Sequence, residues 1–121
     1  MKVEITFNNE FIRGLEKAAL ASAVETLEAV YANLTNETKT MPFDTGDMQN
    51  NQTFVETSET GAVLMTGSPQ ARRLYYHPEY NFQRGENANA GAYWLEPYIT
   101  GGKKDFAQAE FTEIFKRRAG L

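Results

Sequence analysis

Cysteine is absent from the 121-residue sequence, and histidine occurs only once, at position 77. Without cysteine the chain has no disulfide bond, no thiolate zinc site and no cysteine nucleophile. No apolar run approaches the roughly 20 residues that a membrane-spanning helix needs, and the first residues lack the apolar stretch of a secretory signal peptide. A chain of this length is typical of one domain whose core needs no covalent cross-link, so we expect a single domain over residues 1–121.

Basic residues are fewer than acidic ones, and the formal net charge is −4. This balance weighs against general nucleic-acid binding, because contacts to phosphate depend on clustered cations. Residues 41–67 contain acids but no lysine or arginine, whereas cations cluster at Arg72–Arg73, Lys103–Lys104 and Lys116–Arg118. Separate patches of unlike charge suit docking to another protein, and ordinary solvated charge is the alternative.

The first half of the chain shows two clear periodicities. Residues 2–7 alternate, with Val3, Ile5 and Phe7 on one face, which predicts a half-buried strand. Asn8 then offers an N-cap side chain, so a long helix is expected to follow, to about Thr35. Its expected apolar stripe is Phe11, Leu15, Leu20, Val24, Leu27, Tyr31 and Leu34. The small residues at 18–23 would let a neighbouring element approach this helix closely.

Turn chemistry and two strands are expected next. In residues 41–52, Asp44 can cap a short helical turn, and Gly46 permits a backbone angle that other residues resist. Strands are predicted at 53–58 and 62–67, joined as a hairpin. Apolar side chains alternate with Leu64 and Thr66 in the second strand, so we expect it to be covered on both faces. The segment 92–98, AYWLEPY, has the composition of a further strand.

A C-terminal helix is predicted from about Lys103 to Arg118, with Gly120 as its stop. Its expected apolar side consists of Phe106, Ala109, Phe111, Ile114 and Phe115. The resulting fold class is α+β: a small antiparallel sheet packed against a long N-terminal helix and a C-terminal helix, with a long irregular aromatic-rich loop.

Residues 71–85, ARRLYYHPEYNFQRG, allow three interpretations: a nucleic-acid platform, a catalytic loop around His77, or a partner interface. A catalytic histidine would need an activated nucleophile and an orienting carboxylate, and no G-x-S-x-G setting is present. The acidic balance and the missing RNA-recognition signature weigh against nucleic acid. Arginine and tyrosine are enriched at interface hot spots. We therefore expect a partner interface formed by Arg72, Arg73, Tyr75, Tyr76, His77, Tyr80, Phe82 and Trp94.

Carboxylates occur in two close pairs, Asp44/Asp47 and Glu56/Glu59, which offer hard-cation ligands in principle. The sequence lacks the D-x-D-x-D-G and H-E-x-x-H patterns that would arrange such ligands. We interpret the first pair as part of a capped turn and the second as solvent-facing strand and turn positions. No metal, cofactor or catalytic residue is predicted.

Two segments together resemble a family of phage proteins. Residues 41–51, MPFDTGDMQNN, resemble the P-x-D-T-G-x-L turn of the small head–tail joining proteins of tailed phages, the HK97 gp10-like group. Residues 71–97, ARRLYYHPEYNFQRGENANAGAYWLEP, resemble the minor capsid protein branch from phages and prophages of Gram-positive bacteria, with its Y-A-R-R-L-Y-Y core, N-x-N-A spacer and W-x-E. The sequence departs from the pattern at Met48, where leucine is usual, and at Gln70, where tyrosine often stands.

The resemblance implies a non-enzymatic virion protein of the head–tail connector, or neck, present in the host cytoplasm during assembly. Its partners would be other copies of itself in a ring and the neighbouring connector and tail proteins, with no membrane and no specific nucleic acid. The residues that match the turn are Asp44, Thr45 and Gly46, and those that match the second motif are Arg72, Arg73, Tyr75 and Tyr76, with Phe82 and Trp94 in its extension.

Two further expectations concern the second motif. Arg72 and Arg73 would pair with acids, on this chain or on the next subunit. Tyr75 and Tyr76 would point to opposite sides if the segment is extended. The alternative function is a small non-viral α+β binding module or a hydrolase that uses the Arg72–Arg84 loop.

Overall fold

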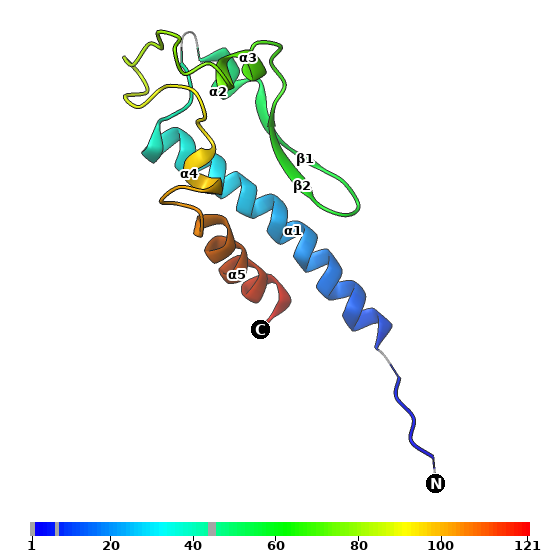
Figure 1. Cartoon of the computed structure of the whole chain (residues 1–121). Coiled ribbons are helices and arrows are strands. Elements are labelled where there is room, and N and C mark those ends of the chain that lie inside the picture. Colours follow the sequence, from blue (N-terminus) through cyan, green and yellow to red (C-terminus); the bar gives the residue numbers. More distant parts are fainter. Residues whose placement is uncertain (1, 7, 44–45) are drawn as a thin grey trace.

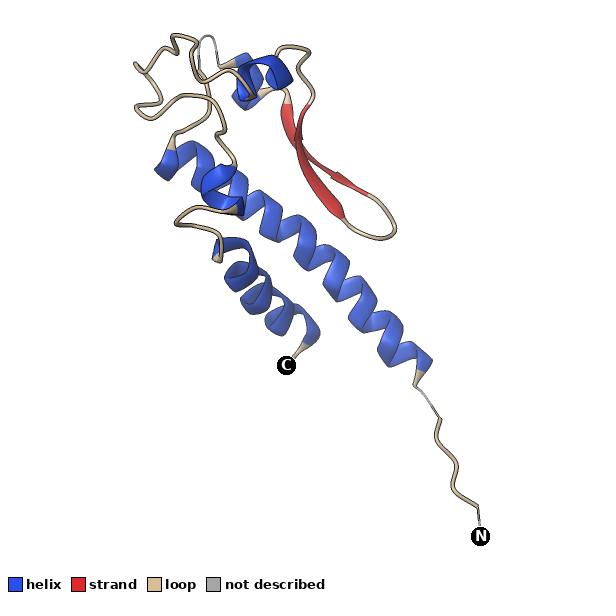
Figure 2. Cartoon of the chain, viewed as in Figure 1, coloured by secondary structure: helices blue, strands red, loops and turns tan. Residues whose placement is uncertain are grey.

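The computed structural model describes residues 2–6, 8–43 and 46–121. Two helices dominate it, and a two-stranded antiparallel sheet lies beside the longer one (Figure 2), which confirms the predicted α+β class. No helix in the described part of the chain is long and apolar enough to cross a membrane. In chain order the elements are α1 (Asn9–Asn33), the π-helical turn η1 (Leu34–Thr38), α2 (Asp47–Asn50), β1 (Thr53–Thr57), β2 (Ala62–Thr66), α3 (Ala71–Tyr75), α4 (Glu96–Ile99) and α5 (Phe106–Ala119).

Helix α1 begins where the sequence predicts. The Asn8 side chain accepts a hydrogen bond from the Phe11 amide at 3.0 Å, which satisfies one of the amides left free at a helix start. The most deeply buried positions of its first six turns are small rather than large: Ala18, Ser22 and Thr26. Each hydroxyl donates to a carbonyl four residues earlier, at 2.6 Å for Ser22 and 2.7 Å for Thr26. The polar groups of this narrow face are therefore satisfied inside the helix.

Helix α5 runs antiparallel to α1 and lies beside it (Figure 1). Arg117 donates to one carboxylate oxygen of Glu25 at 2.6 Å, and Arg118 donates to the other at 2.8 Å. The predicted stop is confirmed, because Gly120 adopts a left-handed φ of 74°. The predicted start at Lys103 is wrong, since the residues before Phe106 form turns. Ala109 is exposed, and Ala107 takes its place on the covered side.

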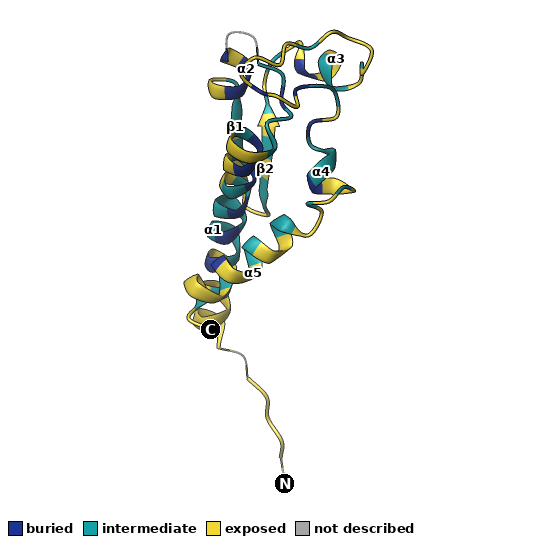
Figure 3. Ribbon diagram, turned by 90° about the vertical axis from the view of Figure 1, so that its left-hand side faces the viewer, coloured by how far each residue is buried: buried dark blue, intermediate teal, exposed yellow. Residues whose placement is uncertain are grey.

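The hairpin pairs β1 with β2 in the register Thr53↔Thr66 and Val55↔Leu64. Its inner face includes Leu64, which packs against the core. The opposite face exposes Phe54, Val63 and Met65, so the expectation that the second strand is covered on both faces is wrong. The physical reason is that α1 lies against one side only and no described element covers the other (Figure 3).

The predicted strand at the N-terminus is not formed. Residues 2–6 project beyond the start of α1 (Figure 1), and Val3 and Ile5 are 87% and 81% exposed. Phe7 lies outside the described residues. A strand needs a partner edge for its backbone, and residues 2–6 make no hydrogen bond with the described part of the chain. The alternation is present, but the pairing is not.

The core lies at the C-terminal end of α1, where the hairpin, the short helices and the loops meet (Figure 3). Its fully covered large side chains are Leu34 and Met41. The remaining buried members of the cluster are Val30, Met48, Ala71, Trp94 and Tyr98. The Tyr98 hydroxyl donates to the Asn33 side chain at 2.6 Å and is 2.9 Å from the Thr38 hydroxyl. Burial raises the pKa of Tyr98, which keeps this hydroxyl protonated.

Candidate functional site

A shallow open hollow lies between α3 and the segment 93–95, on the side of the core that faces solvent. We call it the aromatic groove. It is lined by Thr66, Ala71, Arg72, Tyr75, Tyr76, Trp94 and Leu95. Four of the eight residues predicted for a partner interface therefore lie around one surface feature: Arg72, Tyr75, Tyr76 and Trp94.

Helix α3 ends at Tyr75, which is more buried in the groove than Tyr76, the residue that follows the helix. The segment is helical rather than extended, so the condition under which the two tyrosines would point to opposite sides is not met. Consecutive side chains of a helix still diverge by about 100°, and here Tyr75 is half-buried whereas Tyr76 is 58% exposed. Buried Ala71 brings the start of this helix close to the core.

Tyr75 is the centre of the aromatic contacts. Its ring meets three others edge-on, with centroid separations of 4.7 Å to Trp94, 5.2 Å to Tyr76 and 5.6 Å to Tyr93. Edge-on contacts are a favoured aromatic geometry because the positive ring edge meets the negative face. Among the lining residues, Trp94 is only 3% exposed whereas Tyr76 is accessible, and the exposed ring of Tyr93 lies next to Tyr76.

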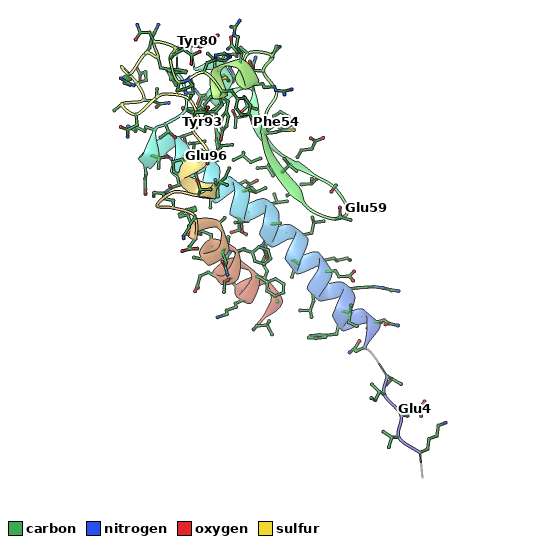
Figure 4. The ribbon with its side chains drawn as sticks, in the orientation of Figure 1. Glu4, Phe54, Glu59, Tyr80, Tyr93 and Glu96 are labelled. Atoms are coloured by element: carbon green, nitrogen blue, oxygen red, sulfur yellow. The ribbon has the colours of Figure 1, made fainter. Side chains whose placement is uncertain are left out.

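The opposite wall is positioned by a kink at Tyr93, which adopts a positive φ of 52°. Its amide donates to the Tyr75 carbonyl at 3.0 Å, which ties the two walls together. The predicted strand at 92–98 is wrong, because the chain kinks at Tyr93 and enters α4, where Pro97 occupies the first turn. The Tyr75 hydroxyl donates to Glu96 at 3.4 Å, and Figure 4 shows Glu96 close below Tyr93.

The Tyr75 hydroxyl remains a hydrogen-bond donor throughout the neutral range. Burial is the main cause that raises the pKa of Tyr75, and the nearby negative charge of Glu96 adds to it. The groove therefore offers a half-buried phenol and exposed rings to a partner, rather than a group that ionises near neutral pH.

The small polar segment 85–92 is held in place by hydrogen bonds of the buried Asn87 side chain, a role that was not predicted from the sequence. Asn87 is 4% exposed, and its side-chain amide donates to the Met41 carbonyl at 2.8 Å and to Gln49 at 2.7 Å. The Gly91 amide donates to the Thr40 carbonyl at 3.1 Å. The only available sequence signal was the N-A-N-A spacing, since asparagine often bonds to backbone groups in loops.

The two adjacent arginines are exposed, and neither forms an ion pair with a described residue. Only Arg72 lines the groove. Pairing with an acid of the same chain is thus not seen in the described part, and pairing with another subunit stays a prediction.

The remaining predicted interface residues lie outside the groove. His77 is 2.6 Å from Glu79, and its ring stacks on Tyr80 with centroids 4.7 Å apart. The hydrogen bond from His77 lowers the pKa of Glu79. Phe82 borders a separate hollow with Pro42, Phe43 and Leu74.

Of the predicted structural turn, only Gly46 can be assessed, because Asp44 and Thr45 lie outside the described residues. Gly46 has a φ of 86° and precedes α2, which confirms the expected need for a permissive residue. A Cβ atom here would lie 2.7 Å from the Phe43 ring. The Asp47 carboxylate accepts hydrogen bonds from Asn51 and Gln52 at 2.9 and 2.7 Å.

Comparison with known proteins identifies no relative: no family model, no curated protein and no solved structure matches this chain. The sequence motifs and the geometry of the groove are therefore the features of this chain that bear on its function.

Proposed function

We propose that this chain is a structural, non-enzymatic subunit of the head–tail connector of a tailed phage or prophage, acting as a ring component in head–tail joining. One observation carries the proposal: the segment that resembles the minor capsid proteins forms an aromatic groove that exposes Arg72 and Tyr76, with the exposed ring of Tyr93 next to them. A partner side chain that enters this groove would rest on buried Trp94.

The composition of the groove supports a protein partner. Tyrosine, tryptophan and arginine are the residue types enriched among interface hot spots, where rigid rings provide contact area at a small entropic cost. Arg72 contributes a cation that forms no ion pair with a described acid of its own chain. A partner with an aromatic or aliphatic side chain next to a carboxylate would match both features.

Ring assembly also requires two different surfaces on each subunit, because head-to-tail contacts are heterologous. The hairpin carries the exposed acids Glu56 and Glu59, and Glu59 lies at its tip, far from the groove (Figure 4). Arg72 and Arg73 lie beside the groove. This separation of unlike charge supports contacts between successive subunits, since complementary potentials favour and orient association.

The test is complementation of a phage that lacks this gene, using Arg72→Ala and Tyr76→Ala. Both side chains are exposed, so the variants should keep the melting temperature within about 2 °C of the parent. Head–tail joining should fail, and electron microscopy should show filled heads and free tails. The matched control is Arg13→Ala, which removes an exposed arginine of α1 that bonds to no described residue and should leave the titre unchanged.

Three results would count against the proposal. Full titres of tailed particles with both variants would show that the groove is not a joining surface. A gene located away from the portal, capsid and tail genes would favour the binding-module or hydrolase alternative. Sub-micromolar binding to DNA at physiological salt would instead favour a nucleic-acid role.

A further inference from the structure

The N-terminal arm, residues 2–6, has the pattern of a strand but no partner. Lys2, Glu4 and Thr6 alternate with Val3 and Ile5, and both apolar side chains are left in water. Period-2 alternation over such a stretch is typical of a strand with one covered face. Because α1 starts at Asn9, the arm extends away from the body of the molecule (Figure 1).

The hairpin has a free edge at β1, where backbone groups have no hydrogen-bonding partner among the described residues. Gly67 donates to Gln52 and Ser58 donates to Gly61, so the hydrogen-bonded pairs are Phe54↔Met65 and Glu56↔Val63. The N–H and C=O groups of Thr53, Val55 and Thr57 therefore point outward from β1. No hydrogen bond from another described segment meets them. A two-stranded sheet is marginal by itself, and a third strand stabilises it.

The apolar pattern of the arm also matches that of the sheet. Phe54, Val63 and Met65 are exposed on one face of the hairpin. A third strand along β1 would place Val3 and Ile5 beside Phe54 on that face. Pairs of an aromatic and a β-branched side chain are among the favourable cross-strand neighbours.

In this structure the arm does not meet its own hairpin. It leaves the start of α1 and points away from the hairpin, which lies further along the helix (Figure 1). Residues 2–6 are exposed and make no hydrogen bond with the described part of the chain. A strand supplied by a second copy can lie along the whole β1 edge.

We propose that the arm of one copy adds as a third strand to the free β1 edge of a second copy. Donor and acceptor surfaces differ, so the contact is heterologous and leads to a ring or a chain of subunits. The inference rests on the proposed function only for the setting of such a ring. The pairing itself follows from the geometry of the arm and the hairpin.

The absence of cysteine permits a direct test. A tagged Ile5→Cys variant is mixed with an untagged Glu56→Cys variant, and the mixture is treated with a short thiol-to-thiol cross-linker. Mass spectrometry should find the peptide with position 5 joined to the peptide with position 56, between a tagged and an untagged chain. The matched control replaces Glu56→Cys by Glu28→Cys, an exposed site on α1, and should give no comparable product.

A second variant tests the strength of the contact. Val3→Asp with Ile5→Asp should weaken self-association in analytical ultracentrifugation by at least about tenfold, because it removes two apolar side chains from the contact. Residues 2–6 are exposed and make no hydrogen bond with other described residues, so the melting temperature of the monomer should not change. A Glu4→Gln variant should associate like the parent.

Equal cross-linking at positions 28 and 56, or a chain that stays monomeric at every concentration, would overturn the inference. These failures are separable from failure of the proposed function, because Arg72→Ala and Tyr76→Ala test the groove without altering the arm. Loss of joining in those variants without arm cross-linking would leave the connector proposal intact.

Discussion

Asn87 connects its own loop to the loop at Met41 and to helix α2 through one side chain. Its amide group bonds to the Met41 carbonyl and to the Gln49 side chain, and both bonds are buried. A buried acceptor left without a donor loses its hydration and gains nothing in return. One small side chain therefore holds the spacer of the groove segment against the loop that follows α1.

Replacing Asn87 should show how much the stability of the fold depends on these two hydrogen bonds. We expect Asn87→Ala to lower the free energy of unfolding by about 1–3 kcal/mol, because the Met41 carbonyl and the Gln49 amide oxygen lose their common donor. Urea denaturation would measure it. Asn81→Ala is the control, since Asn81 is exposed in the same loop and should change stability by less than about 0.5 kcal/mol. Equal effects of the two substitutions would contradict the assigned role.

Helix α1 buries a face of small residues, and its Glu25 forms ion pairs with two arginines of α5. Ser22 and Thr26 let a neighbouring backbone approach α1 because their hydroxyls bond within the helix. At the last turn of α5, Arg117 and Arg118 both donate to Glu25. These hydrogen bonds lower the pKa of Glu25, which means that the folded state prefers the ionised carboxylate.

This preference predicts a pH dependence of definite sign. A carboxyl whose pKa is lower in the folded chain contributes stability above its ordinary pKa and loses it as the pH falls through the lowered value. Glu25→Gln should therefore reduce the melting temperature at pH 7, and the difference from the parent should shrink in acid. Glu28→Gln, on the same helix, should show no such pH-dependent difference. A constant deficit for Glu25→Gln at all pH values would show that charge is not the cause.

The burial of side chains changes along the length of α1, from exposed near its start to buried near its end. Thr26, Val30 and Leu34 are buried where the core meets α1, whereas Phe11 and Ile12 near the start of the helix are exposed. Isolated helical turns without packing are marginally stable in water, so local opening should be frequent at the exposed end. The packed end should open only with the rest of the core.

Hydrogen exchange can measure this gradient. At concentrations at which the chain is monomeric, amides of residues 26–34 should exchange far more slowly than those of residues 11–16. Protection of the early turns should rise with protein concentration if neighbouring copies cover them. Uniform protection along α1 in the monomer would contradict the uneven coverage seen in the structure.

Local signals predicted the elements that depend on neighbouring residues. The cap at Asn8, the left-handed glycines Gly46 and Gly120, and the hairpin between 53 and 66 all follow from chemistry within a few residues of each feature. The predicted strand at 2–7 failed because alternation records what a segment is suited to pair with, while pairing needs an edge that lies within reach.

For the candidate site, too, some features followed from the sequence and others only from tertiary contacts. Composition pointed to Arg72, Tyr75, Tyr76 and Trp94, because their residue types are those that protein interfaces use. Contacts between residues far apart in sequence determined which of them share a groove: Tyr75 meets Trp94, and Asn87 meets Met41. His77 and Phe82 carry the same composition signal but lie elsewhere.

The sequence by itself thus determined the cap at Asn8, the helix stop at Gly120 and the hairpin, because caps, turns and periodicity act over a few bonds. Only the tertiary structure decided that the arm is unpaired, that one sheet face is open and that four dispersed residues line one groove. Those outcomes depend on which distant segments close onto each other, and that choice is made by the packing of the whole core.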